Sequence, residues 1–222
     1  MKQNEQELQF LKDEIKQMWK LVISQVEKTK QALLKNNTEL AWEVISFEKR
    51  VNAFDLKIDS YCEHYIALYS PVAIDLRLAL SIMKISVTLE RIADYAAGIA
   101  RHVADEDCLK FSSQMKEILG IEAMFDILLS MLTDSLVALN LENTSNSGRI
   151  LAKDKKVNTI YRSAFLLLTQ QLQKEPKAIN CGLKMILILQ KMERIGDHCS
   201  NIVEEIVFYI EAKVLKHKGK QE

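Results

Sequence analysis

Two acidic pairs in this sequence have the residue types and the spacing of a cation site. Glu90 and Asp94 lie four residues apart in "LERIAD", and Glu193 and Asp197 lie four residues apart in "MERIGD". Residues i and i+4 of an α-helix share one face, so each pair presents two carboxylates side by side. Clustered carboxylate oxygens suit hard or borderline cations such as iron, manganese, magnesium and calcium. The acidic pairs therefore suggest metal binding at two related places.

Further polar residues follow helical spacing in the segment that precedes each pair. If these two helices of each half lie side by side, their polar stripes border one carboxylate patch on the surface of the molecule. The candidate ligands in these preceding segments are Glu48, Asn52 and Asp55 in the first half, and Asp154 and Asn158 in the second; Asn201 is a further candidate on the helix of Glu193 and Asp197.

The alternative to a metal site is an ordinary solvated helix face. An outward polar stripe is typical of any amphipathic helix. Two acids at i, i+4 repel one another by roughly 0.2–0.5 kcal/mol, however, and here the arrangement occurs twice. Arg91 and Arg194 follow the two glutamates, and we expect them to orient the acids through salt bridges. Both alternatives stay open at this stage.

The elements that must position these residues are long helices. Six glycines and two prolines among 222 residues are few, and Leu, Ile, Lys, Glu and Ala are abundant. This composition predicts an all-α fold. Turn signals and capping residues, including Thr38 as an N-cap and Pro71 at the first position of a helix, divide the chain into six helices. Their expected ranges are 5–35, 38–69, 71–104, 113–140, 148–174 and 176–217.

The second half of the chain repeats the first. Pro71 and Pro176 lie 105 residues apart, the segments "EKRVN" and "DKKVN" lie 106 apart, and the two Glu-Arg-Ile motifs lie 103 apart. Landmarks in one order at nearly one offset indicate an internal duplication. Apolar residues spaced alternately four and three apart predict nearly antiparallel helix packing. We therefore expect two tandem three-helix bundles, residues 1–107 and residues 108–222.

Composition also limits the environment and the partners. Thirty basic and thirty acidic residues cancel, so the net charge does not favour nucleic acid. The N-terminus lacks the apolar core of a signal peptide, and continuous apolar runs are short, so we expect a cytoplasmic protein without direct membrane insertion. Scattered cysteines are expected to be reduced thiols, and both tryptophans are expected in the core or in bundle contacts; these residues are Cys62, Cys108, Cys181, Cys199, Trp19 and Trp42.

Catalysis has the least support in the sequence. The Glu-x-x-His pair that di-iron bundle enzymes place in their cores is missing, and so are nucleotide-binding, zinc-protease and serine-hydrolase motifs. Nothing sets a nucleophile beside a base. We predict no catalytic residue and expect that the protein is not an enzyme.

Taken together, two long segments resemble the PhoU family of phosphate uptake regulators. They are "PVAIDLRLALSIMKISVTLERIADYAAGIAR" and "MERIGDHCSNIVEEIVFYI", preceded in the second half by "DKKVN". The resemblance covers nearly the whole chain. It implies surface sites for iron, zinc or another divalent metal ion at Glu90 and Asp94 and at Glu193 and Asp197, with Glu48 and Asp154 opening the partner motifs. Asn52 and Asn158 stand where the family can have Asp, which removes one charged ligand from each site.

The resemblance also implies a role. The family is similar to an adaptor that represses phosphate-starvation signalling by linking the ATPase subunit of a phosphate ABC transporter to a membrane histidine kinase. The expected assembly is a homodimer. The alternative from another class is a helical metal-binding or metal-handling protein without a part in phosphate signalling.

Overall fold

The computed structural model describes residues 3–105, 113–174 and 178–215, and the elements in these ranges are α-helices, which confirms the all-α class. The first repeat contains α1 (Gln3–Lys35), α2 (Thr38–Ser46), α3 (Glu48–Tyr69) and α4 (Ala73–Ala104). The second contains α5 (Ser113–Ile118), α6 (Ile121–Leu141), α7 (Ser147–Lys174) and α8 (Ile179–Glu211).

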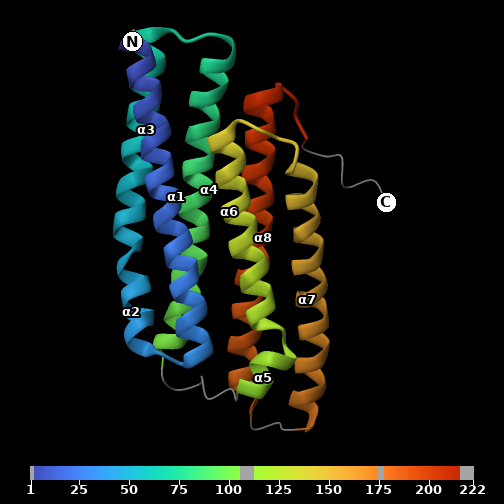
Figure 1. The fold of residues 1–222 in the computed structure, drawn as a ribbon. Helices are drawn as coiled ribbons and strands as arrows, with labels where there is room; N and C mark the ends of the chain where they lie inside the picture. The colour runs from blue at the N-terminus through green and yellow to red at the C-terminus, as the bar shows by residue number, and fades with distance from the viewer. Residues whose placement is uncertain (1–2, 106–112, 175–177, 216–222) are drawn as a thin grey trace.

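The helices form two layers (Figure 1). One layer runs in the order α3, α4, α8, α7, with α2 continuing below α3, and α1 and α6 cover one side of it. Successive long helices run antiparallel, and α4 and α8 form the main contact between the two halves. The predicted pair of three-helix repeats is confirmed, and their buried residues join in one hydrophobic core.

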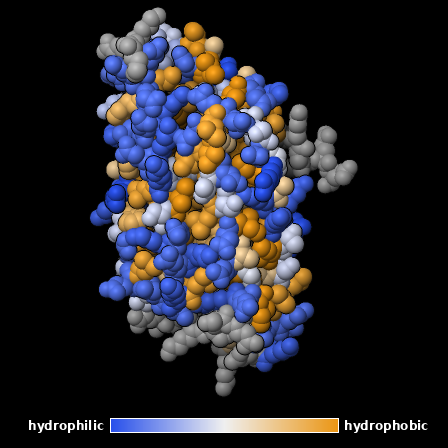
Figure 2. Space-filling view, in the orientation of Figure 1, coloured by the Kyte–Doolittle hydropathy of each residue, from blue (hydrophilic) through white to orange (hydrophobic). Residues whose placement is uncertain are grey.

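The apolar seams predicted from the sequence form that core. Ile85, Leu89 and Ile92 of α4 are fully buried, and so are Met192 and Ile195 of α8. Their spacing of four and three residues keeps a single stripe turned toward neighbouring helices along a nearly antiparallel contact. In the view of Figure 2 the surface is mixed, with hydrophobic side chains interspersed among the hydrophilic ones.

The second predicted helix, 38–69, is interrupted at Phe47. The Phe47 amide donates to the Val44 carbonyl at 3.2 Å and the Arg50 amide donates to the Phe47 carbonyl at 2.9 Å, both across three residues instead of four. This tighter turn separates α2 from α3. The expected N-cap is also corrected: Asn37 precedes α2, and its side chain accepts from the Leu40 amide at 2.9 Å.

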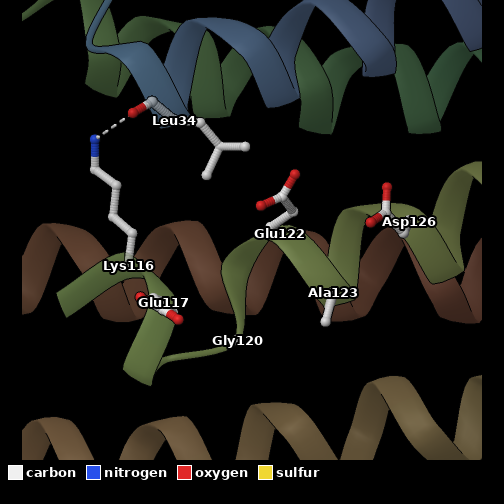
Figure 3. Close-up of a pocket in the computed structure, with 7 residues that line it drawn as sticks. All are labelled: Leu34, Lys116, Glu117, Gly120, Glu122, Ala123 and Asp126. Carbon is white, nitrogen blue, oxygen red and sulfur yellow. Dashed lines mark hydrogen bonds between the residues drawn. The ribbon is translucent and has the colours of Figure 1, made fainter. Parts of the chain in front are cut away.

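The fourth predicted helix, 113–140, is likewise broken, at Gly120. Gly120 has φ 68°, a left-handed conformation that glycine adopts without steric cost. The break turns α5 toward the end of α1, where Lys116 donates to the Leu33 carbonyl and to Asn36 Oδ1, both at 2.6 Å. Figure 3 shows this residue and its longer bond to the Leu34 carbonyl, at the edge of a hollow of about 610 Å³. The glycine thus lets a lysine cap the C-terminus of α1.

Two further helix boundaries differ from the prediction. α4 begins at Ala73 instead of Pro71, because Ser70 adopts a left-handed conformation and Val72 is extended. These residues reverse the chain between antiparallel helices. α8 ends at Glu211, where Ala212 has φ 55°. The predicted start at Pro176 and the predicted end at residue 217 lie outside the described residues.

The two tryptophans have different environments. Trp19 of α1 is fully buried, and its Nε1 donates to the Leu132 carbonyl of α6 at 3.1 Å, which joins the two repeats. Trp42 of α2 is 62% exposed, so its predicted place in the core or in a bundle contact is wrong. Because Ala41 and Val44 form the buried side of this short helix, Trp42 projects outward.

One described helix, α6, passes a test of length and hydropathy for a membrane span. Half of its apolar window is buried within the protein, and Phe125 and Leu128 are fully buried. α6 is apolar because it packs against three other helices, α1, α7 and α8.

The tryptophans provide a stability test of this packing. We expect Trp19→Ala to lower the free energy of unfolding by about 3–5 kcal/mol, because it leaves a cavity and removes the hydrogen bond between repeats. Trp42→Ala, the matched control, should change it by less than about 0.5 kcal/mol. Urea unfolding followed by circular dichroism measures both, and equal losses would contradict the packing described here.

Candidate metal-binding acidic patches

The first acidic patch consists of Glu48 and Asp55 of α3 with Glu90 and Asp94 of α4. Partial burial raises the pKa of Glu90, and the charges of Asp94 and Asp55 raise it further. Partial burial also raises the pKa of Asp94, to which the charge of Glu48 adds. The two predicted stripes lie on α3 and α4, which pack together, and their like charges repel.

Two residues that the sequence analysis missed hold this patch in place. Arg101 of α4 pairs with Glu48 across 2.5 Å, and the Ser86 hydroxyl donates to Asp55 Oδ1 at 2.8 Å. Arg101 lies seven residues after Asp94 and therefore on the same face of α4, a signal that the sequence contained. Each bond ties an acid of α3 to α4.

The second acidic patch consists of Asp154 of α7 with Glu193 and Asp197 of α8. Burial raises the pKa of Asp154, and the charge of Asp197 raises it further. Burial also raises the pKa of Glu193, to which Asp197 and then Asp154 add. The backbone of α8 comes close here: a Cβ on Gly196 would lie 3.0 Å from Asp154 Oδ1. A glycine at this position admits the aspartate between the helices.

The two oxygens of Asp154 have different partners. Oδ2 accepts a hydrogen bond from the side-chain Nδ2 of Asn158 at 3.1 Å. Oδ1 is buried and has no hydrogen-bond partner in the described part of the chain. An acceptor that is buried and left without a donor is costly, so a cation beside Oδ1 would satisfy it.

The predicted orienting arginines behave differently. Arg194 contacts both acids of its own pair, Glu193 at 3.8 Å and Asp197 at 3.6 Å. Arg91 lowers the pKa of Glu90 through its charge but makes no ion pair within the described ranges. It lines a hollow of about 490 Å³ between α4 and α8.

Two of the predicted additional ligands, Asn201 and Asn52, have different surroundings. Asn201 lines the same hollow as Arg91, against the first repeat, and Asn52 is exposed on α3. His198 also lies at this hollow, where its ring stacks on Tyr95 with centroids 5.6 Å apart. Burial lowers the pKa of His198, and Arg91 lowers it further, so the neutral imidazole serves as an interface residue.

The atoms that the two patches offer to a metal ion are carboxylate oxygens. Cys199 is buried near Asp154, and burial raises the pKa of its thiol, so it does not offer a thiolate. Cys62 and Cys199 are buried free thiols and Cys181 is half-buried; Cys108 lies outside the described residues. Within the described ranges no three His, Cys, Asp or Glu side chains converge as a ready metal site. A bound ion would therefore take part of its coordination from water or after side-chain rotation.

These features define a class: an all-α protein of two tandem three-helix repeats, each with an outward carboxylate patch made by two neighbouring helices. The model of the PhoU domain matches this chain twice, over residues 15–103 and 121–206. The chain belongs to the PhoU family.

Similar proteins agree with this assignment over almost their whole length. The chain is 32% identical to the phosphate-specific transport system accessory protein PhoU of Escherichia coli strain K12, over 97% of this chain and 88% of that relative. It is 31% identical to the Edwardsiella tarda protein of the same name, over 96% and 86%. The crystal structure of PhoU from Pseudomonas aeruginosa superposes with a TM-score of 0.88 at 28% identity, covering 95% of this chain and 100% of that one. The relatives are named as accessory and regulatory proteins and not as enzymes.

The raised carboxyl pKa values predict a pH dependence of stability. A folded-state pKa above the unfolded value stabilises the protonated native state, and this stabilisation is lost as the pH rises through the folded pKa. We therefore expect Glu193→Gln to raise the free energy of unfolding near pH 7 by roughly 0.2–0.5 kcal/mol. The gain should vanish below about pH 4, where glutamate is protonated in both states.

Glu142 is the matched control with the opposite sign. The hydrogen bond from Lys12, at 2.6 Å, lowers the pKa of Glu142. Its stabilisation is present above the unfolded pKa and lost as the pH falls through the folded pKa. Glu142→Gln should therefore destabilise the protein at neutral pH and have little effect in acid. Urea unfolding at several pH values measures both variants, and the same sign for the two would refute this account of the patches.

Proposed function

We propose that this protein regulates phosphate transport and represses phosphate-starvation signalling. The observation that carries the proposal is the match to PhoU proteins over nearly the full chain, with both Glu-Arg-Ile-x-Asp motifs placed on equivalent helices of the duplicated fold. In this role the protein is a cytoplasmic adaptor, without enzymatic activity, between the ATPase subunit of a phosphate ABC transporter and a membrane histidine kinase. It acts as a homodimer.

The shape of the molecule supports an adaptor. Helices α3, α4, α8 and α7 form a broad layer, and its outer side offers area for a protein partner. The pockets are shallow and the acidic residues lie on rigid helices, so recognition by surface is favoured over turnover of a small substrate.

Metal binding at the acidic patches is the second part of the proposal. Oxygen donors from Asp154, Glu193 and Asp197 suit a divalent ion such as manganese, magnesium or iron, and zinc also accepts carboxylates. The buried, unsatisfied Oδ1 of Asp154 supports a cation at the second patch. When bound, the ion would neutralise acids whose pKa values are raised by burial and by mutual repulsion. If metal handling were the sole role, the protein would bind metal without a part in phosphate signalling.

The regulatory role is tested by deletion of the gene. We expect phosphate-starvation genes to be expressed at high phosphate in the deletion strain, and the wild-type gene to restore repression. Reporter expression at high and low phosphate measures this. Unchanged repression in the deletion strain would overturn the proposed regulation.

Metal binding is tested separately on purified protein. We expect stoichiometric divalent metal after purification without chelators, and its loss from the second patch in the Glu193→Ala, Asp197→Ala double variant. Glu211→Ala, which changes an exposed acid of the same helix outside the patch, is the control. Elemental analysis and the thermal shift on adding Mn²⁺ measure occupancy. Metal-free wild-type protein that gains no stability with Mn²⁺ would refute the metal site.

A further inference from the structure

Helix α7 carries an excess of positive charge in a protein whose basic and acidic residues cancel overall. It contains six Lys and Arg residues and a single acid, Asp154. One of the six, Lys153, pairs with Asp134 of α6. The other five basic side chains are exposed and make no ion pair within the described ranges; they are Arg149, Lys155, Lys156, Arg162 and Lys174. Their charge is therefore free to attract an anionic partner.

The outward side of α7 combines these cations with exposed hydrophobic side chains. Four exposed residues follow one another at spacings of four, three and four, and so form one stripe, which we call the outer stripe: Lys155, Thr159, Arg162 and Leu166. Leu166 is 63% exposed, and its neighbours Phe165 and Leu167 are 45% and 40% exposed. Exposed apolar side chains that are bordered by polar ones mark an interaction site.

The outer stripe lies on a ridge and not in a groove. Figure 1 shows α7 at the edge of its layer, where it packs against α6 and α8. A shallow hollow of about 410 Å³ is lined by side chains of α7, which include Arg162, Phe165 and Leu166. The cation and the two apolar side chains therefore share one continuous surface.

The first repeat serves as an internal comparison. At an offset of 106 residues, Arg162 corresponds to Leu56 and Phe165 corresponds to Asp59. The equivalent helix, α3, contains three basic and four acidic residues, against six and one in α7. Since both repeats form the same fold, the excess of cations on α7 is not required by the scaffold.

We propose that the outer stripe of α7 binds an anionic lipid surface and holds the protein reversibly against a membrane. Lys155 and Arg162 would contact phosphate groups of the lipids, while Leu166 enters the boundary between head groups and acyl chains. The stripe is roughly 17 Å long and straight, so all three side chains can meet a flat surface at once. This contact leaves the chain on the membrane surface without spanning it. It goes beyond the proposed regulation and does not depend on it.

Charge and shape decide between this occupant and three others. A second copy of the chain laid on the outer stripe would set the cations of two α7 helices against one another. Nucleic acid would satisfy the cations, but its phosphate backbone offers no apolar contact to Leu166 and Phe165. A helix of a partner protein binds in a hydrophobic groove, whereas the outer stripe is a ridge. An anionic lipid surface matches the cations, the apolar side chains and the ridge.

The acids of the second patch do not lie along the outer stripe. Asp154 precedes Lys155 by one residue and is therefore turned by about 100° around α7, toward α8. Glu193 and Asp197 belong to α8, and Arg194 contacts both of them. A lipid surface against the outer stripe thus meets Lys155 and Arg162 before it meets these acids.

The experiment measures binding of the purified whole protein to lipid vesicles by co-sedimentation. We expect binding to phosphatidylcholine vesicles that contain phosphatidylglycerol, weaker binding at high salt, and no binding to pure phosphatidylcholine. Equal binding to both kinds of vesicle, or binding to neither, would overturn the proposal. No partner protein is needed, so the result is independent of whether gene deletion changes phosphate-starvation signalling.

Charge-reversal variants locate the site. The Lys155→Glu, Arg162→Glu double variant should bind the anionic vesicles at least about tenfold more weakly. The Lys20→Glu, Lys49→Glu double variant is the matched control, since it changes the net charge equally at exposed lysines of α1 and α3, and it should retain most of the binding. Circular dichroism and thermal melting establish that each variant folds. Equal binding by the two folded double variants would refute the assignment.

A second pair of variants tests the apolar contact. Leu166→Gln should weaken binding roughly fivefold, because it removes the side chain that enters the lipid. Leu56→Gln is the control, since Leu56 is 72% exposed on α3, and it should leave binding unchanged. Equal binding by Leu166→Gln and the wild-type protein would contradict a lipid contact at this stripe.

Other occupants give distinct results. Suppose that duplex DNA or an acidic helical peptide binds the wild-type protein but not the Lys155→Glu, Arg162→Glu variant, and that vesicles bind neither. The outer stripe would then belong to that partner, and the proposal would be overturned. A dimer that this variant dissociates in sedimentation analysis would make the stripe a self-interface, which also overturns it.

Discussion

The antiparallel contact between α4 and α8 is the interaction on which the rest of the molecule depends. Both helices belong to the core of their own repeat and also face one another, so each buries residues on two sides. Equivalent residues meet across this contact: Tyr95 and His198 hold the same place in the two repeats, and their rings stack. An approximate twofold axis therefore passes between them, and the acidic patches of the two repeats lie on either side of it.

Because the helices of both repeats are rigid and shared through one core, the acids have little freedom to separate. Their side chains remain partly buried beside like charges, which raises the pKa of Glu90, Asp94, Asp154 and Glu193. A solvated surface helix would avoid this arrangement, since repulsion and desolvation both act against folding. Local electrostatic cost of this kind is typical of binding sites, where a ligand or a partner supplies the missing opposite charge.

The duplication kept the scaffold and changed its surface. Both repeats retain an acid pair after the apolar seam, but the helix before each pair has diverged, with acids along α3 and aromatic rings along α7. Core positions are held by packing density, whereas outward positions are free to change. Gly196 of α8 and Ala93 of α4 hold equivalent positions in the two repeats. Glycine occurs in the second repeat, where Asp154 approaches the helix backbone.

The amino-acid sequence by itself determined the helices, their seams, the duplication and the outward direction of the acid pairs, because these follow from spacing at 3.6 residues per turn. It did not reveal the breaks at Phe47 and Gly120 or the exposure of Trp42, since each depends on where a neighbouring helix ends. Only the tertiary structure decided which acids share a patch, that Arg101 and Ser86 hold the first patch, and that Arg91 and Asn201 lie elsewhere. The physical reason is that helical periodicity gives the direction of a side chain around its own helix, while a binding site requires the relative placement of two helices, which the packing of the shared core decides.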